Sequence, residues 1–175
     1  TINADTTGIN NNGIKLESIS NGTVIIGSGV TVSVGNDTAI NAEGSTNATI
    51  TNSGTISSGN AKTIQLEERG GVAASGAIVN NNFGGTITGP TNTIKTDGQG
   101  NITTNTTINN SGLISVTTSG RAIGPSTGND TGTVVNNNST GIIVKTSTAD
   151  AAAEVITLGN SGTITNSGQI RNDVS

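Results

Sequence analysis

The sequence predicts an all-β fold, a parallel β-helix (β-solenoid) of about six coils with three short strands in each coil. Three observations predict it. An Asn-Ser-Gly motif recurs between Ile-containing segments, apolar residues occur only in short packets, and Thr, Ser, Asn and Gly fill most of the chain between the packets. A repeat of roughly 27 to 29 residues is typical of stacked architectures in which each unit packs on its neighbours.

The motif is clearest at 50–56, 108–114 and 164–170, with looser copies at 78–87 and 134–143. Asn52 has the same parity along its strand as Ile50, so its side chain should start inward at the bend. Stacked about 4.8 Å apart, such amides can hydrogen-bond as a ladder; the alternative is that they only form surface turns. The predicted ladder contains Asn52, Asn81, Asn110, Asn137 and Asn166.

The packets of β-branched residues predict a narrow aliphatic core. Side chains alternate between the two faces of a strand, so each Ile should point inward and its Thr neighbours outward. No window has apolar residues at helical spacing for long enough to form a helix. The predicted core residues are Ile50, Ile56, Ile64, Ile78, Ile87, Ile94, Ile108, Ile114, Ile123, Ile143, Ile156, Ile164 and Ile170.

Composition limits the classes of function. The 175 residues predict one domain, 1–175, which we expect to be a processed or excised segment because it starts at Thr1. The net charge is −4 and the 7 Lys and Arg are scattered, which argues against nucleic-acid binding. No apolar run could span a membrane. Disorder is the alternative for so polar a chain, but the regular placement of Ile argues against it.

Between the asparagine motifs lies a further packet that contains an Ile, and in four repeats an acidic residue follows this Ile by three positions, as Glu17 follows Ile14. Stacking of the coils would place these four acidic residues in one column. Like charges stacked directly are unfavourable, so calcium or the neighbouring Lys15 and Lys95 could relieve them, or the side chains could extend into water. The column is therefore a weak candidate metal site, and no other metal ligand or cofactor is expected. Its members are Glu17, Glu43, Glu67 and Asp97.

The chain is not predicted to be an enzyme. It contains no His and no Cys, so the most usual proton shuttle and the thiol nucleophile are both missing. The packets are separated by short spacers, so no long insertion could wall off a cleft. We therefore expect no catalytic residue. The segment between Gly59 and Gly76, which is irregular, is expected to leave the rod as a loop and to form a lateral contact.

The repeats at 49–57, 107–115 and 163–170 resemble the passenger regions of bacterial autotransporter adhesins and related secreted β-helix proteins. The resemblance covers about residues 13–171. It implies a right-handed parallel β-helix, export to the bacterial cell surface, and adhesive or scaffolding work. The membrane barrel of a complete autotransporter is missing, so the chain is either a fragment or a separate secreted subunit.

Neither end of the sequence contains a candidate helical cap, and exposed coil ends invite head-to-tail stacking. We therefore expect an extracellular structural or adhesive protein whose partner is a second copy of itself in a surface filament. One alternative is an adhesin passenger that binds host or glycan surfaces through other cell-surface molecules. An ice-binding solenoid and a polysaccharide-active β-helix enzyme are further alternatives.

Overall fold

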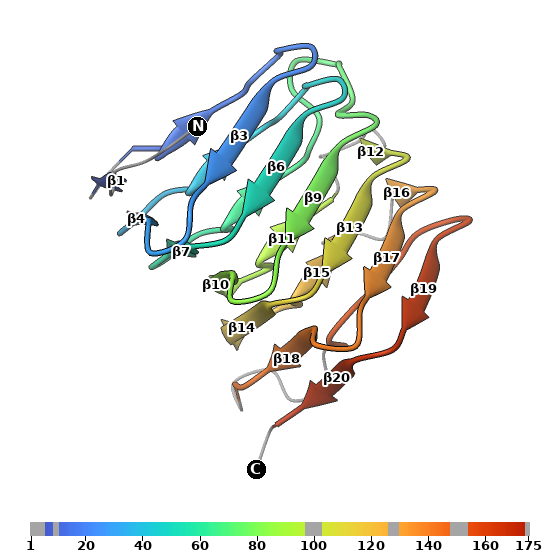
Figure 1. Ribbon diagram of the computed structural model, residues 1–175. Helices are drawn as coiled ribbons and strands as arrows, with labels where there is room; N and C mark the ends of the chain where they lie inside the picture. Colours follow the sequence, from blue (N-terminus) through green and yellow to red (C-terminus); the bar gives the residue numbers. More distant parts are fainter. Residues whose placement is uncertain (1–5, 9–10, 97–102, 126–129, 148–153, 174–175) are drawn as a thin grey trace.

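The computed structural model describes residues 6–8, 11–96, 103–125, 130–147 and 154–173, which form a β-solenoid of about 5 turns (Figure 1). The predicted fold class is confirmed: the described residues contain strands and no helix, and successive coils stack their strands into three parallel sheets of seven, six and five strands. The described residues form about 5 turns, where the sequence predicted about six coils. The described residues also contain no helix able to cross a membrane.

Sheet A holds the strand before each predicted asparagine corner, and its strands follow one another along the rod (Figure 1). Equivalent residues lie directly opposite one another, since Thr49 pairs with Ile78 and Ile78 pairs with Thr107. Sheet A contains β3 (Thr23–Ile26), β6 (Thr49–Asn52), β9 (Ile78–Asn81), β13 (Thr107–Asn110), β17 (Val134–Asn137) and β19 (Thr163–Asn166).

Sheets B and C complete the cross-section, and the chain runs through C, then A, then B in each coil. Sheet B contains β1 (Thr6–Gly8), β4 (Thr31–Val34), β7 (Thr55–Ser58), β10 (Thr86–Thr91), β14 (Leu113–Ser119), β18 (Ile142–Lys145) and β20 (Gln169–Asn172). Sheet C contains β2 (Ile14–Lys15), β5 (Ile40–Asn41), β8 (Ile64–Gln65), β11 (Ile94–Lys95) and β15 (Ile123–Gly124). A small fourth sheet pairs β12 (Thr103–Thr104) with β16 (Asp130–Thr131).

The core consists of stacked columns of aliphatic side chains, one column from each sheet. Register places Ile56 opposite Ile87 and Ile87 opposite Ile114 in sheet B. Burying such a side chain contributes about 1.5–3 kcal/mol. Nine of the predicted core residues are fully buried: Ile50, Ile56, Ile64, Ile87, Ile94, Ile108, Ile114, Ile123 and Ile143. Ile156 and Ile170 are partly buried and pack against this cluster.

Two predicted core residues are exposed. Ile78 is 38% exposed because it stands opposite Thr49 in the outward column, while its neighbour Val79 fills the core position. The parity rule applied to Asn81 would have selected Val79, so this error was avoidable. Ile164 has the inward parity, opposite Val135, yet it is 44% exposed. It belongs to the last described coil, β19 and β20, and no described coil covers it.

The corners between sheets A and B alternate in length. Corners 27–30, 82–85 and 138–141 have four residues, whereas corners 53–54, 111–112 and 167–168 have two. Each short corner packs on the long corner before it: a Cβ at Gly54 would meet the Val30 carbonyl oxygen at 2.1 Å, and a Cβ at Gly112 would meet that of Gly85 at 2.2 Å. The repeating unit is therefore two coils, a long-corner coil followed by a short-corner coil.

Candidate functional site: ladder, charged edge and exposed last coil

The five predicted asparagines form one column of hydrogen-bonded amides. The Asn52 amide donates to Asn81 Oδ1 at 2.9 Å, and Asn81 donates to Asn110 Oδ1 at 2.8 Å. The column continues from Asn110 to Asn137 at 2.8 Å and from Asn137 to Asn166 at 2.8 Å. The first four members are buried. All donations point the same way along the rod, so the column has a direction.

Each internal amide also holds backbone of its own coil and of the next. The Asn137 amide donates to the carbonyl oxygens of Gly141, at 3.2 Å, and Gln169, at 3.1 Å, besides Asn166 Oδ1. An unsatisfied buried amide would cost about 1–3 kcal/mol. The ladder therefore connects strand ends of adjacent sheets. Two of the three acceptors of the Asn137 amide belong to the next coil, so its hydrogen bonds depend on the coil that follows.

The ladder is incomplete at both ends. Asn166 Oδ1 accepts from Asn137, but the Asn166 amide has no acceptor among the described residues. At the other end, the position opposite Asn52 in the preceding strand is Ile26, which is fully buried. The last coil is open: all four residues of β19 are exposed, and only Ile170 of β20 is partly buried.

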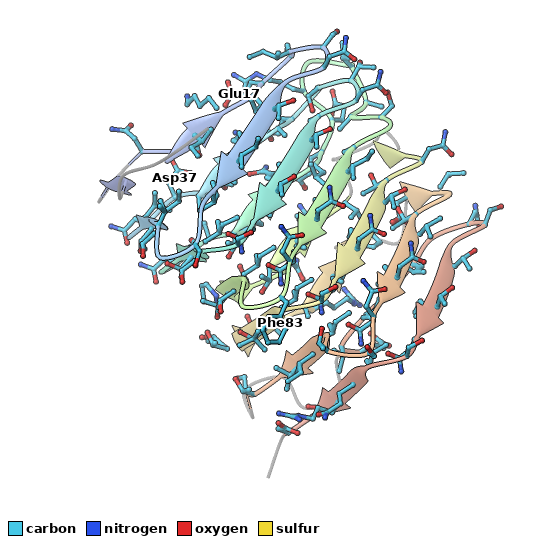
Figure 2. The ribbon with its side chains drawn as sticks, viewed as in Figure 1. Glu17, Asp37 and Phe83 are labelled. Carbon is cyan, nitrogen blue, oxygen red and sulfur yellow. The ribbon has the colours of Figure 1, made fainter. Side chains whose placement is uncertain are left out.

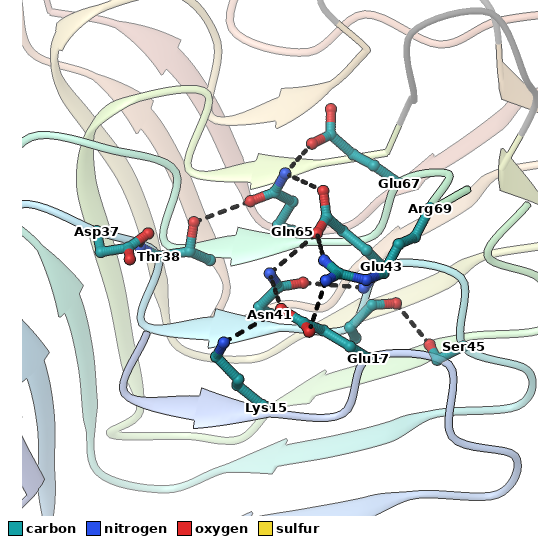
Figure 3. Close-up of polar contacts among 11 residues, drawn as sticks. Lys15, Glu17, Asp37, Thr38, Asn41, Glu43, Ser45, Gln65, Glu67 and Arg69 are labelled. Carbon is teal, nitrogen blue, oxygen red and sulfur yellow. Dashed lines mark hydrogen bonds and ion pairs between the residues drawn. The ribbon is translucent and has the colours of Figure 1, made fainter. Parts of the chain in front are cut away.

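The acidic column lies along sheet C and is bridged by amide side chains (Figure 3). The Asn41 amide donates to Glu17 Oε1 at 2.8 Å and to Glu43 Oε2 at 3.0 Å. The Gln65 amide donates to Glu43 Oε1 at 2.7 Å and also to Glu67. Neutral donors thus stand between stacked carboxylates and reduce the repulsion between them.

Arg69 adds the positive charge that the column needs. Its guanidinium lies 3.3 Å from Glu17 Oε2 and 3.1 Å from Glu43 Oε2, so it spans two coils (Figure 3). Lys15 lies 3.7 Å from Glu17 Oε1. Arg69 is half exposed, so each of its pairs contributes less than about 1 kcal/mol and is weakened by salt.

Glu67 differs from its neighbours because it is buried and pairs with Lys95, which is also buried. Burial raises the pKa of the Glu67 carboxyl, and the Lys95 ammonium partly offsets that rise. The carboxylate edge is therefore occupied by this chain's own cations and amides. The fourth predicted member, Asp97, lies outside the described residues, and the described residues contain no group of three acidic, His or Cys side chains placed to hold a metal ion.

Sheet A presents a face of a different kind. Its six strands contain no Asp, Glu, Lys or Arg. One outward column holds a second amide ladder, in which Asn109 donates to Asn80 Oδ1 and Asn136 donates to Asn109 Oδ1, both at 2.9 Å. The other outward column mixes Thr with Ile78 and Val134. Phe83, the only aromatic residue of the chain, is 78% exposed in the adjoining corner (Figure 2).

The segment 59–76 departs from the expected loop. It contributes β8 to sheet C, with Ile64 and Leu66 fully buried, and only the short hairpin between Arg69 and Val72 leaves the rod. That hairpin returns Arg69 to the acidic column. Sequence reasoning missed Asn41, Gln65 and Arg69 as partners of the carboxylates. The repeated placement of Asn41 and Gln65 directly after the packet Ile was the signal that could have found the first two.

Comparison with known proteins finds no family model that matches the chain, and no curated protein or solved structure is significantly similar to it.

Proposed function

We propose that this chain is an extracellular structural rod of the bacterial cell surface that joins end to end with a second copy of itself to form a fibre. The observation that carries the proposal is the exposed last coil. Ile164 and Ile170 occupy core registers there, and β19 and β20 present strand edges beyond which no described strand lies. Such an edge takes up a further parallel strand readily.

The corner alternation supports a second copy as the occupant. The last coil has the short corner 167–168, so the next coil in the pattern has a long corner. The first complete coil of the chain has the long corner 27–30. Head-to-tail stacking therefore continues the two-coil unit without a break, and a head-to-tail contact that does not close on itself gives a filament.

The join would be weaker than a step inside the rod. Pairing β19 with β3 of the second copy sets Asn166 opposite Ile26, so the amide ladder is interrupted there. Losing one buried hydrogen bond costs about 1 kcal/mol, which favours reversible growth. Location outside the cell is proposed from the absence of cysteine, from the polar composition and from the resemblance to secreted β-helices.

The test is concentration-dependent assembly of the purified chain, followed by sedimentation velocity and electron microscopy. We expect fibres of solenoid width whose mass rises above a critical concentration. Ile170→Asp places a charge in the core register of the join and should leave a folded monomer. Gln169→Asp adds the same charge to the exposed side of the same strand and should assemble like the unchanged chain. An unchanged chain that stays monomeric at millimolar concentration would reject the proposal.

Adhesion is a second candidate, favoured by the charge-free face of sheet A and by Phe83 beside it. Amide columns and an exposed ring suit neutral polysaccharides, since rings stack on sugars and amides bond to hydroxyl groups. Phe83→Ala should then weaken co-sedimentation with an insoluble neutral glucan, while Val72→Ala, which removes an exposed apolar side chain elsewhere, should not. Equal binding by both variants would count against this candidate.

A further inference from the structure

Sheet C brings an amine, a carboxamide and a carboxylate into contact at one point. Gln65 of β8 and Lys95 of β11 are register partners on adjacent strands, so their side chains leave the sheet side by side on the same face. The Glu67 carboxylate contacts both of them. Its Oε1 pairs with Lys95 Nζ, and its Oε2 accepts a hydrogen bond from Gln65 Nε2. One carboxylate is therefore placed to pass a proton from the amine to the carboxamide.

The carboxamide of Gln65 has a different environment at its oxygen and at its nitrogen (Figure 3). The oxygen accepts a hydrogen bond from the buried Thr38 hydroxyl at 2.9 Å, whereas the nitrogen donates to Glu43 Oε1 at 2.7 Å as well as to Glu67. A hydroxyl donor stabilises negative charge on the oxygen, and carboxylates stabilise positive charge on the nitrogen. These are the charges that develop when an amine adds to the carbon of an amide and the amide nitrogen leaves.

Burial favours the uncharged, nucleophilic form of the amine. Lys95 is 8% exposed and Glu67 is 5% exposed, so a neutral pair costs less here, relative to the ion pair, than it does in water. Burial also raises the pKa of the Glu67 carboxyl, against the opposing effect of the Lys95 and Lys62 ammonium groups. Glu67 can therefore accept a proton from Lys95 Nζ and leave a nucleophile beside Gln65.

We propose that Lys95 and Gln65 form an isopeptide bond with each other, a spontaneous cross-link between two coils in which Glu67 transfers the protons. This inference does not depend on the proposed fibre. Lys95 Nζ adds to Gln65 Cδ and forms the new C–N bond, and the Cδ–Nε2 bond then breaks. Of the three protons of the Lys95 ammonium, one stays on the new amide and two pass through Glu67 to the departing nitrogen, which leaves as ammonium. Nothing is oxidised or reduced, and each chain reacts once.

A similar set of residues between β2 and β5 shows what burial contributes. Lys15 and Asn41 are also register partners, and the Asn41 amide donates to Glu17 Oε1 at 2.8 Å. Lys15 Nζ, however, lies 3.7 Å from that oxygen, and the Lys15 side chain is 59% exposed. Water solvates this ammonium, so we expect no bond between Lys15 and Asn41. The chain therefore contains its own comparison for the buried set.

The test is the mass of the folded full chain, measured by mass spectrometry under denaturing conditions. We expect the chain to be lighter than its sequence requires by one molecule of ammonia. Trypsin cleaves after Lys and Arg but not after an acylated Lys95, so the digest should contain peptide 63–69 joined to peptide 70–121. A chain held unfolded in urea should keep its full mass and lose ammonia only after it refolds, because the reaction needs the contacts of the folded state.

Three variants identify the reacting groups. Lys95→Arg keeps a cation beside Glu67, and Glu67→Gln keeps the size of that side chain; both should fold, keep their full mass and give the unlinked peptides. Asp173→Asn, which changes an exposed carboxylate that pairs with Arg171, should lose ammonia like the unchanged chain. Circular dichroism of each variant establishes that the comparison is made between folded chains.

Four results would overturn the cross-link. The first is a folded, unchanged chain that keeps its full mass after prolonged incubation at neutral pH. The second is a loss of ammonia that persists in Lys95→Arg, because it would then come from another amide of the chain. The third is a joined peptide that contains Lys15 and Asn41 in place of Lys95 and Gln65. The fourth is a loss of water in place of ammonia, which would make Glu67 the residue joined to Lys95.

Discussion

The middle coil and the last described coil have nearly the same sequence but different surroundings. Strand β13 reads Thr-Ile-Asn-Asn and β19 reads Thr-Ile-Thr-Asn. Ile108 of the first is fully buried and Ile164 of the second is 44% exposed, although both occupy the inward register. Burial in this rod is therefore a property of neighbouring coils rather than of the repeat itself.

The same contrast holds for the asparagines. Asn110 receives a hydrogen bond from Asn81 and gives one to Asn137, while Asn166 only receives. The same residue type is therefore a buried amide with its hydrogen bonds satisfied in the middle of the rod, and an amide with no acceptor among the described residues in the last coil. Single substitutions made in matched pairs, one in the middle coil and one in the last, can measure how much stability each residue gains from the coil that follows it.

The largest difference is expected for the core isoleucines. Ile108→Ala leaves a cavity between two fixed coils and should lower the free energy of unfolding by about 2–5 kcal/mol. Ile164→Ala removes a side chain that is already partly in water and should cost below about 1 kcal/mol. Urea unfolding of both monomeric variants, monitored by circular dichroism, gives the comparison. Equal losses would mean that the last coil is covered in solution.

The ladder should give the next largest difference. Asn110→Ala removes the acceptor of Asn81 and the donor to Asn137 inside the rod, at a cost of about 2–4 kcal/mol. Asn166→Ala should cost below about 1 kcal/mol, because the Asn137 amide keeps its two carbonyl acceptors. Asn109→Ala, in the outward column of the same strand, controls for the loss of an amide where water can replace it. The measurement is the denaturation midpoint at constant slope.

The short-corner glycines test whether the end coil can move. A Cβ at Gly112 would meet the Gly85 carbonyl oxygen at 2.2 Å, and a Cβ at Gly168 would meet the Asn138 carbonyl oxygen at 2.3 Å. The two clashes are alike, but only the last coil can shift away. We expect Gly112→Ala to cost about 1–3 kcal/mol and Gly168→Ala less than half of that, by thermal unfolding. Equal costs would show that the last coil is as rigid as the middle.

The smallest expected effect concerns the ion pairs and pH. Because the pKa of Glu67 is raised in the folded protein, the folded state holds the proton more tightly than the unfolded chain. Glu67 therefore makes stability fall as pH rises from near 4.3, the usual glutamate pKa, through its raised folded value. Glu67→Gln should remove that fall. Asp173→Asn, which breaks the exposed pair with Arg171 in the last coil, is the matched control for losing one carboxylate. Denaturation from about pH 4 to pH 7 supplies the slopes.

The sequence was sufficient for the fold because the period, the parity and the β-branched packets all point to the same stacking. Asn52, Asn81, Asn110, Asn137 and Asn166 share one spacing and one parity, and the structure sets them in one column. The exposure of Ile164 could not be predicted from its own repeat, because burial at this register depends on a further coil packing on it, and no described coil does so. Reading parity from Asn81 would have replaced Ile78 by Val79 in the predicted core.

The polar contacts of the candidate site were harder to predict. Glu17 and Glu43 could be placed in one column from their spacing after the packet Ile. Arg69 could not be assigned to them, because it reaches them through the hairpin that follows β8, whose path depends on packing rather than on repeat position.

The alternation of long and short corners has a consequence for how such a rod can change length. Duplication or deletion of a single coil would bring two corners of equal length together. A short-corner glycine would then no longer pack on the carbonyl oxygens of a long corner. Gain or loss of two coils together leaves each short-corner glycine packed on the carbonyl oxygens of a long corner. Genes for rods of this kind should therefore grow and shrink by coil pairs, and a related chain with an odd number of coils should carry a compensating change at one corner.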